Sequence, residues 1–334
     1  MTARVPSLFA MSPEYLPRLF PEPLLRRLGA VLDIDPQLVA RDFTEPGVAA
    51  RLGDVEVIVS GWGAPAIDAA VLEAAPKLRA VLHAAGSVKW IDAAAHERGV
   101  AVASAVAANA VPVAEYTLAA VLMAGKGLFG MRERFRAERG FVIGRDHADA
   151  GNFGRTVGLI GASRIGRRVI ELLRPFDFDV LLADPYVRRD EADRLGVRLA
   201  EVDDLVAESD IVSLHAPDLP ETRHLIDAGR LAAMKDGAVL VNTARGNLVD
   251  TDALVARLRT GRISAVLDVT APEPLPADSP LFDLPNVFLT PHVAGSQGNE
   301  LARMGLYIVE EAERLAAGEP LLHAIDPATL WKQA

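Results

Sequence analysis

Three polar side chains, each placed after a short apolar run, have the types needed for acid–base chemistry on a small anion. They are Arg245, Glu273 and His292. Histidine serves as acid and as base near neutral pH, a carboxylate can hold its ring, and arginine offers two parallel donors to a carboxylate. Each residue alone is more often structural. Because all three follow predicted strands, where the ligand sites of parallel sheets collect, together they indicate interconversion of an alcohol and a ketone.

A second motif has the form of a phosphate cradle. Residues 156–170 read as a buried strand, a tight turn and a helix, with Gly161, Ser163 and Gly166 in the turn. Small residues let the backbone approach a pyrophosphate, and N–H groups at a helix N-terminus receive its charge. The usual fingerprint has glycine where Ser163 stands, so the Ser163 hydroxyl is expected to point at the phosphate or at solvent. A glycine-rich turn that binds no cofactor is the alternative.

The position of Asp184 predicts which dinucleotide is bound. It follows the next predicted strand, at the spacing expected for a carboxylate that accepts hydrogen bonds from ribose hydroxyls. A carboxylate there would also repel a 2′-phosphate. NAD is therefore predicted and NADP is less favoured, with Arg188 and Arg189 nearby as the opposing feature.

Composition limits the partners and the compartment. The length of 334 residues suits two domains, and the formal net charge of −10 argues against nucleic acid or an anionic membrane as a partner. The chain contains no cysteine, which excludes disulfides, thiolate catalysis and Cys-ligated zinc and fits a reducing cytoplasm. No metal site is predicted. Residues 1–20 lack the apolar run of a signal peptide, and the apolar window 105–125, interrupted by Pro112, is predicted to be a buried helix rather than a membrane span.

Apolar runs alternate with helical patterns along most of the chain, which predicts an α/β fold with two doubly wound parallel sheets. A helix starting at Pro112 is expected to follow the first sheet, and a final helix is expected at about 298–317. The polar stretch 128–152 is either a solvated helix and linker or an arm that packs on a partner subunit. Strands are expected at 5–9, 55–60, 78–84 and 100–103, and then at 156–160, 179–183, 197–199, 211–214, 238–241, 263–267 and 287–289.

The ordered set of motifs from about residue 55 to residue 317 resembles the D-isomer-specific 2-hydroxyacid dehydrogenase family, which includes D-lactate, D-3-phosphoglycerate and glyoxylate/hydroxypyruvate enzymes. The motifs are His215-Ala-Pro, Glu221-Thr-Arg-His, Asn242-Thr-Ala-Arg-Gly and Thr290-Pro-His-Val-Ala-Gly. The resemblance implies hydride transfer between NAD(H) and C2 of a small D-2-hydroxy acid or its 2-oxo acid. It makes His292 the acid/base, Glu273 its partner and Arg245 the substrate-binding residue. The cofactor-binding residues that it implies are Gly161, Ser163, Arg164, Ile165, Gly166, Asp184, His215, Ala216, Thr222, Thr243, Ala244, Asp268, Ala294 and Gly295.

The resemblance also implies a layout. Residues 1–108 and 298–334 would form a flavodoxin-like substrate domain, into which a Rossmann NAD-binding domain, 109–297, is inserted. The active site would lie in the cleft between the two domains, and two copies would form a homodimer through the cofactor domains. That expectation favours the arm at 128–152.

On the substrate side, backbone N–H groups of Ala85, Gly86, Ser87 and Val88 are expected to bind the substrate carboxylate, although this loop lacks the family's usual Gly-x-Gly. Trp62 either closes over the substrate side chain or packs as an ordinary core residue. In the first case it favours an apolar or aromatic 2-oxo acid over a phosphorylated one, since the first domain has no extra basic cluster.

Two other functions fit the same scaffold. One is a non-catalytic NAD(H)-sensing binding protein of the co-repressor type, although no partner-recognition extension is evident. The other is a phosphite-type dehydrogenase, which keeps a similar Arg, Glu and His set. Formate dehydrogenases place glutamine where Glu273 stands, so the carboxylate speaks against that activity.

Overall fold

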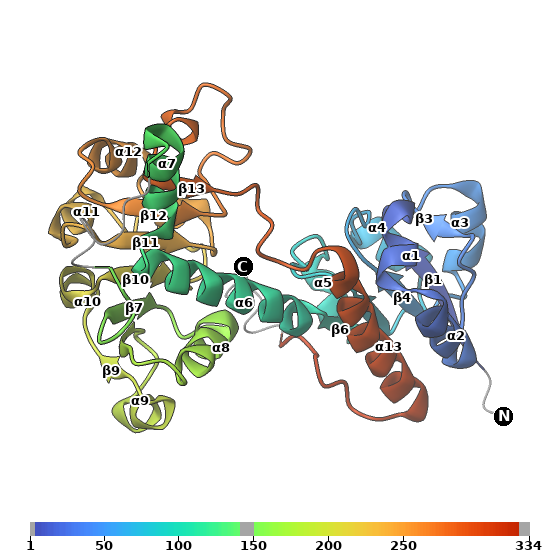
Figure 1. The fold of residues 1–334 in the computed structure, drawn as a ribbon. Helices are drawn as coiled ribbons and strands as arrows, with labels where there is room; N and C mark the ends of the chain where they lie inside the picture. The colour runs from blue at the N-terminus through green and yellow to red at the C-terminus, as the bar shows by residue number, and fades with distance from the viewer. Residues whose placement is uncertain (1–3, 141–149, 327–334) are drawn as a thin grey trace. The chain divides into compact units, whose positions relative to one another are not determined.

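The computed structural model describes residues 4–140 and 150–326, and the chain divides into two compact units (Figure 1). Unit 1 comprises Met1–Asn109 and Ser296–Ala334, and unit 2 comprises Ala110–Gly295. Each unit is built on one parallel sheet with helices, which confirms the predicted α/β class with two parallel-sheet domains.

The sheet of unit 1 has the strand order β2-β1-β4-β5-β6, with β3 also pairing with β1, and every pairing within it is parallel. Its strands are β1 Val5–Ala10, β2 Leu32–Asp33, β3 Val39–Ala40, β4 Val57–Ser60, β5 Ala80–His83 and β6 Ala101–Ser104. The two-residue strands β2 and β3 were not predicted. Beyond the last helix, Ala324 forms an antiparallel bridge with Ala103 at the edge of β6.

The sheet of unit 2 has the order β13-β12-β11-β10-β7-β8-β9 and is parallel in every pairing. Each of these strands lies within one residue of a predicted one. The central strands are buried on both faces, which explains why they read as continuous apolar runs. The strands are β7 Thr156–Ile160, β8 Asp179–Ala183, β9 Arg198–Leu199, β10 Ile211–Leu214, β11 Val239–Asn242, β12 Ser264–Leu267 and β13 Val287–Leu289.

Several helices begin at an aspartate that caps them. Asp68, Asp92, Asp227 and Asp250 each accept a hydrogen bond from an N–H group two or three residues ahead, which satisfies a donor that has no partner inside the helix. The helices are α1 Leu16–Leu19, α2 Glu22–Val31, α3 Pro46–Leu52, α4 Ala69–Ala74, α5 Ala93–Glu97, α6 Val106–Gly125, α7 Leu128–Glu138, α8 Arg164–Leu173, α9 Arg189–Leu195, α10 Val202–Glu208, α11 Ala228–Ala233, α12 Thr251–Arg259 and α13 Leu301–Ala317.

The predicted start of the helix at Pro112 was wrong. Helix α6 begins at Val106, and Pro112 lies inside it, where it cannot donate to the preceding turn. The helix continues through the proline because Ala108, Val113 and Ala114 on its sides are buried. Burial of these side chains offsets the one lost hydrogen bond.

By length and composition α6 could span a bilayer, and 44% of its most apolar window is buried in the fold. Core helices meet the same criteria. The stretch predicted as linker or arm begins with the exposed helix α7, and residues 141–149 of that stretch lie outside the described residues.

Candidate active site

The predicted site residues of unit 2 follow one row of paired residues across its sheet. The last residues of neighbouring strands pair with one another across the sheet. In the order of the strands from β8 to β13 they are Ala183, Ile160, Leu214, Asn242, Leu267 and Leu289. The residues that come next in the chain are Asp184, Gly161, His215, Thr243, Asp268 and Thr290. All six therefore leave the sheet at its carboxyl edge, on strands about 4.8 Å apart. Of these six, the sequence analysis missed Thr290.

The cradle at Gly161 requires glycine for two reasons. Gly161 has φ +102°, and a Cβ there would lie 2.7 Å from the backbone of His215 and Ala216. A Cβ on Gly166 would lie 2.2 Å from the Gly161 carbonyl oxygen. At these two glycines the backbone of the turn packs directly against α8 and against the end of β10. Because no side chain projects from either glycine, the space at the helix N-terminus can accept a pyrophosphate.

Ser163 takes a different role from the expected one. Its hydroxyl accepts a hydrogen bond from the Gly166 N–H at 3.3 Å and so caps α8, instead of pointing at a phosphate or at solvent. The N–H groups of Ser163, Arg164 and Ile165 donate to no acceptor within the described residues. These three donors fit an anion at the start of the helix.

Asp184 holds the same turn from the neighbouring strand. Its carboxylate accepts from the N–H of Ala162 at 2.7 Å and from the N–H of Tyr186 at 2.8 Å. The side chain is only partly buried, so its oxygens keep lone pairs that can accept from ribose hydroxyls.

Arg245 lies in a turn that is clamped by its neighbour. The Asn242 side chain accepts from the Ala244 N–H at 3.1 Å and donates to the Arg245 carbonyl at 2.9 Å. The guanidinium donates to the Ala244 carbonyl at 2.6 Å and forms no ion pair within residues 4–140 and 150–326. Most of its donors therefore stay available for an anion.

The Glu273 and Arg245 loops are in contact. A Cβ on Gly246 would lie 2.0 Å from the carbonyl carbon of Thr270, so only glycine lets the two backbones approach this closely. The Thr251 hydroxyl also donates to the Ala271 carbonyl at 2.8 Å. The sheet edge thus brings the predicted substrate-binding and carboxylate loops together.

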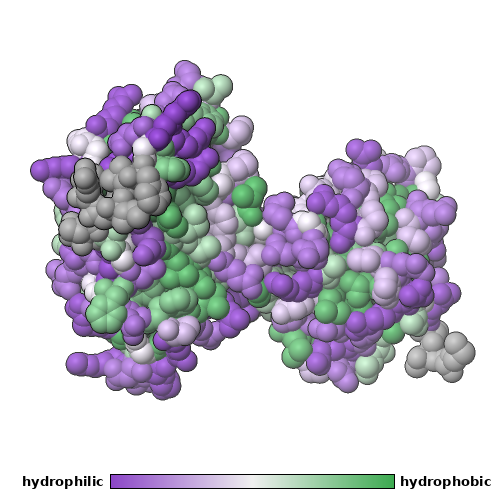
Figure 2. Space-filling model, in the orientation of Figure 1, coloured by the Kyte–Doolittle hydropathy of each residue, from purple (hydrophilic) through white to green (hydrophobic). Residues whose placement is uncertain are grey.

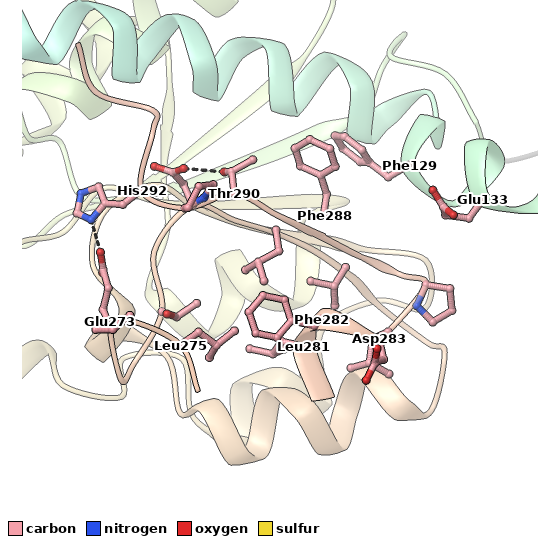
Figure 3. Close-up of a pocket in the computed structure, with 18 of the residues that line it drawn as sticks. Phe129, Glu133, Glu273, Leu275, Leu281, Phe282, Asp283, Phe288, Thr290 and His292 are labelled. Atoms are coloured by element: carbon pink, nitrogen blue, oxygen red, sulfur yellow. Dashed lines mark hydrogen bonds and ion pairs between the residues drawn. The ribbon is translucent and has the colours of Figure 1, made fainter. Parts of the chain in front are cut away.

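His292 and Glu273 form a direct pair. The Nδ1 atom of His292 lies 2.5 Å from Oε1 of Glu273, and Figure 3 shows the two side chains pointing at each other. The side chains are 49% and 42% exposed, respectively. Because the carboxylate occupies Nδ1, Nε2 is the nitrogen left to exchange a proton with a ligand.

His292 has a strained backbone, with φ +54°. A non-glycine residue in this region costs roughly 1–3 kcal/mol and persists only where neighbouring structure holds it. The His292 N–H donates to the Asp268 carbonyl at 2.8 Å, which supplies part of that restraint.

Asp268, which is 2% exposed, supplies the remaining restraint. Its carboxylate accepts from the Thr290 hydroxyl at 2.6 Å, the Val293 N–H at 2.8 Å and the Ala294 N–H at 2.9 Å. The Tyr116 hydroxyl bonds to Thr290 in turn at 2.7 Å. Burial raises the pKa of Tyr116, which keeps this phenol neutral. Asp268 thus positions the His292 loop, a function that the sequence analysis did not anticipate.

The other predicted cofactor residues lie at the same edge. His215 is buried, its Nε2 lies 3.0 Å from the Ser213 hydroxyl, and burial lowers its pKa to about 4. The Thr243 hydroxyl bonds to Thr117 at 2.9 Å, and the Thr222 hydroxyl donates to the Pro217 carbonyl at 2.6 Å, so both are committed within the chain. Ala216 and Ala294 are buried, and Gly295 is the last residue of unit 2.

The predicted substrate-side residues belong to unit 1. In the loop after β5, Ala85 and Val88 are 1% and 2% exposed. The N–H groups of Ala85, Gly86, Ser87 and Val88 donate to no acceptor among the described residues. Four consecutive free donors fit a carboxylate. Trp62 is half-buried, with its ring centroid 5.3 Å from that of Tyr15.

A cavity of about 820 Å³ extends from the His292–Glu273 pair within unit 2. At its far end Phe129 of α7 faces Phe288 of β13, with ring centroids 4.6 Å apart (Figure 3). Phe282 also lines this cavity, and its side chain is 56% exposed. No group of three or more metal-ligating side chains occurs among the described residues.

Comparisons with known proteins agree on one family. A family model described as "D-isomer specific 2-hydroxyacid dehydrogenase, NAD binding domain" matches residues 118–294. A D-3-phosphoglycerate dehydrogenase of Mycobacterium leprae is 40% identical over 267 residues, 79% of this chain and 50% of that protein. A glyoxylate reductase of Korarchaeum cryptofilum is 34% identical over 312 residues, 91% of this chain and 93% of that protein. The chain spans about half the length of the D-3-phosphoglycerate dehydrogenases that it matches.

Solved structures give the same fold. The TT0316 protein from Thermus thermophilus has a TM-score of 0.75 and 30% identity, and the match covers 96% of this chain and 100% of that one. The apo form of Rhodotorula graminis D-mandelate dehydrogenase has a TM-score of 0.81 and 25% identity, covering 97% of this chain and 98% of that one.

Proposed function

This chain belongs to the D-isomer-specific 2-hydroxyacid dehydrogenase family, and we propose that it interconverts a small D-2-hydroxy acid and its 2-oxo acid with NAD(H). The observation that carries the proposal is the row of strand ends in unit 2. From one sheet edge it presents a dinucleotide cradle, a guanidinium that has no ion-pair partner among the described residues, and a histidine held by a carboxylate. A binding protein needs the cradle but has no need for the paired histidine.

The cofactor would be held by residues already described. The free N–H groups of Ser163, Arg164 and Ile165 suit the pyrophosphate, and Asp184 suits the ribose hydroxyls. The buried His215 would face the cofactor as a neutral ring. When bound, NAD(H) supplies or accepts the hydride at C2 of the substrate.

We assign the proton transfer to His292. In reduction of the 2-oxo acid, protonated His292 gives its Nε2 proton to the oxygen on C2, and in oxidation neutral Nε2 removes the hydroxyl proton. Glu273 keeps Nδ1 as the donor in both states, so the ring does not turn. Arg245 would bind the substrate anion and stabilise charge that develops on the carbonyl oxygen.

Unit 1 would be the substrate domain and unit 2 the cofactor domain. The loop 85–88 offers backbone donors to the substrate carboxylate. The relatives named D-3-phosphoglycerate dehydrogenase act on a phosphorylated acid, whereas the half-buried Trp62 beside Tyr15 favours an apolar or aromatic 2-oxo acid here. Arg18 lies over the Tyr15 ring, with its guanidinium carbon 5.7 Å from the ring centroid.

We further propose a cytoplasmic homodimer formed through unit 2. Large hydrophobic side chains are exposed on this unit at the end of α6, on α7 and around β13, namely Met123, Leu128, Phe135, Phe282 and Phe288. In Figure 2 hydrophobic residues gather along α6 on the face of unit 2 that is in view. Arg132 and Glu133 on α7 give the surface both charges, which suits the self-complementary interface of a two-fold dimer.

The test is oxidation of NADH and NADPH with glyoxylate, hydroxypyruvate, pyruvate, 2-oxoisocaproate and phenylpyruvate, followed by chiral analysis of the product. The expected result is NADH-dependent formation of a D-2-hydroxy acid, fastest with an apolar or aromatic substrate. Tight NADH binding without turnover of any of these acids would instead support the sensing protein. NAD⁺ reduction by phosphite alone would support the phosphite-type enzyme.

A further inference from the structure

Unit 1 has a row of buried polar side chains under its substrate loop. Ser60, His83 and Ser104 end β4, β5 and β6, and the registers pair Ser60 with His83 and His83 with Ser104. Their exposed fractions are 0%, 3% and 0%. Buried polar groups are costly unless they are hydrogen-bonded, so the row requires specific partners.

His83 has partners on two sides. Its Nδ1 lies 2.9 Å from the Ser60 hydroxyl, and the backbone of Ser87 faces the ring. Burial lowers the pKa of His83 to about 4, and the Ser87 backbone opposes that shift. A backbone group that favours the protonated ring is a carbonyl, so the Ser87 carbonyl is the group that faces His83. A neutral ring with its proton toward that carbonyl accepts from Ser60 at its other nitrogen.

The Ser87 carbonyl is held a second time. The Trp90 Nε1–H donates to this carbonyl at 3.1 Å, and the ring centroids of Trp90 and His83 are 5.2 Å apart. In a trans peptide the carbonyl and the following N–H point in opposite directions. Holding the Ser87 carbonyl inward against His83 and Trp90 therefore turns the Val88 N–H outward.

The side of the loop 84–88 that faces away from His83 has room for a ligand at Gly86. Gly86 has no neighbour within 4 Å of an added Cβ and no positive φ, so neither packing nor backbone conformation requires glycine there. Close approach of a ligand to the backbone does explain it. Val88 and Ala85 anchor the loop in the hydrophobic cores on either side of the sheet.

We propose that His83 is a positioning residue, which holds the loop 84–88 so that its free N–H groups bind the carboxylate of the 2-oxo acid. This inference rests on the proposed function. His83 touches no reacting atom, and it acts on binding through the orientation of one peptide group.

The experiment compares His83→Leu, which keeps the bulk but loses the hydrogen bond to Ser60 and the polar contact with the Ser87 carbonyl, with His83→Gln, whose amide can both donate and accept. We expect His83→Leu to raise the KM for the 2-oxo acid roughly 10- to 100-fold, because misplaced donors lose much of their binding energy. The kcat should change less than about 3-fold, and the Kd of NADH should be unchanged because unit 2 binds it. His83→Gln should restore a KM within about 3-fold of the wild-type value.

Inhibition by oxamate, a non-reacting carboxylate, gives a second readout, and its Ki should rise in parallel with the KM. Val81→Ala is the matched control, since Val81 lies two residues earlier on the same face of β5 and is fully buried. It should lower the Tm without changing KM or Ki. If His83→Leu does not fold, Ser60→Ala should give a smaller change in the same direction.

Three results would overturn the inference. The first is an unchanged KM and Ki in folded His83→Leu, or in Ser60→Ala when it stands in. The second is the same rise in Val81→Ala as in His83→Leu, and the third is no rescue by glutamine. These results leave the proposed function intact, whereas a wild-type protein that reduces no 2-oxo acid removes both.

Discussion

The two sheets of this molecule end differently. In unit 2 the last row of paired residues is apolar apart from Asn242, and the polar residues follow one position later, outside the sheet. In unit 1 the last row of paired residues is Ala40, Ala10, Ser60, His83 and Ser104, so three of its five residues are polar, and these three are buried inside the sheet.

The difference separates two ways of building a site on parallel strands. In the site proposed here, unit 2 presents side chains to a ligand, as with His292, which is 49% exposed. In the same proposal, unit 1 uses its side chains to hold a loop, as with His83, which is 3% exposed, and offers the loop backbone to the ligand. If this is correct, histidine substitutions in unit 2 and unit 1 should affect different kinetic constants.

The largest expected effect is on His292. His292→Gln keeps a polar side chain of similar size but cannot carry a proton, so kcat should fall by about 10²–10⁴. The Kd of NADH should stay near the wild-type value, because the cradle at Gly161 is untouched. Stopped-flow turnover and fluorescence titration of NADH measure the two quantities.

Glu273→Gln is the companion variant. Its amide still reaches Nδ1 but does not stabilise the protonated ring, so kcat should fall less than in His292→Gln. Wild-type turnover in His292→Gln would show that His292 does not transfer the proton, and the proposed difference between the two units would then be wrong.

The next effect is on stability at acid pH. The pKa of His83 and of His215 is about 4 in the fold against 6.5 for an ordinary histidine. Below pH 6.5 the unfolded chain takes up these protons while the folded chain does not until about pH 4. Each histidine should therefore lower the free energy of unfolding by about 2 kcal/mol between pH 7.5 and pH 5.

Urea unfolding of His83→Gln and His215→Gln at the two pH values isolates each share, since other groups titrate alike in all three proteins. Each variant should lose about 2 kcal/mol of the pH dependence. A variant with the full wild-type dependence would mean that its histidine is protonated in the fold, contrary to a neutral ring under the loop.

A smaller effect is expected for Arg245→Lys. A lysine keeps the charge but not the two parallel donors, so the KM for the 2-oxo acid should rise about tenfold with little change in kcat. Arg262→Lys, at an exposed ion pair with Asp236 in the same unit, serves as the control and should leave KM unchanged. Equal KM values for Arg245→Lys and wild type would assign the carboxylate to other donors.

Much of this arrangement is predictable from the sequence because strand ends are set by burial. Central strands buried on both faces read as apolar runs, so the positions after them, from Gly161 to Asp268, can be located without a structure. The start of α6 could not be predicted, because the local cost of Pro112 favours a boundary there and only tertiary packing of Ala108 and Val113 overrides it.

Contacts between distant segments were also beyond prediction. The Asp268 carboxylate accepts hydrogen bonds from Thr290, Val293 and Ala294, which follow the neighbouring strand. No local sequence pattern predicts that one carboxylate will bind three residues so far along the chain. The orientation of the Ser87 carbonyl likewise depends on a distant pairing, because the register of β4 and β5 places His83 beside Ser60. Sequence patterns therefore predicted which residues gather at the edge of the sheet, but not the long-range contacts that hold them there.

The smallest expected effect tests the cap at Ser163, where the cradle of unit 2 departs from the usual fingerprint. Ser163→Gly restores the common motif and should cost only a few tenths of a kcal/mol, because glycine is a tolerable N-cap, whereas Ser163→Ala should cost about 1 kcal/mol. If the hydroxyl only caps α8, both variants should bind NADH within about 3-fold of the wild-type Kd. A Kd more than tenfold weaker in both variants, with stability changed as expected, would mean that the hydroxyl contacts the pyrophosphate. The cradle would then use a side chain where the structure indicates backbone alone.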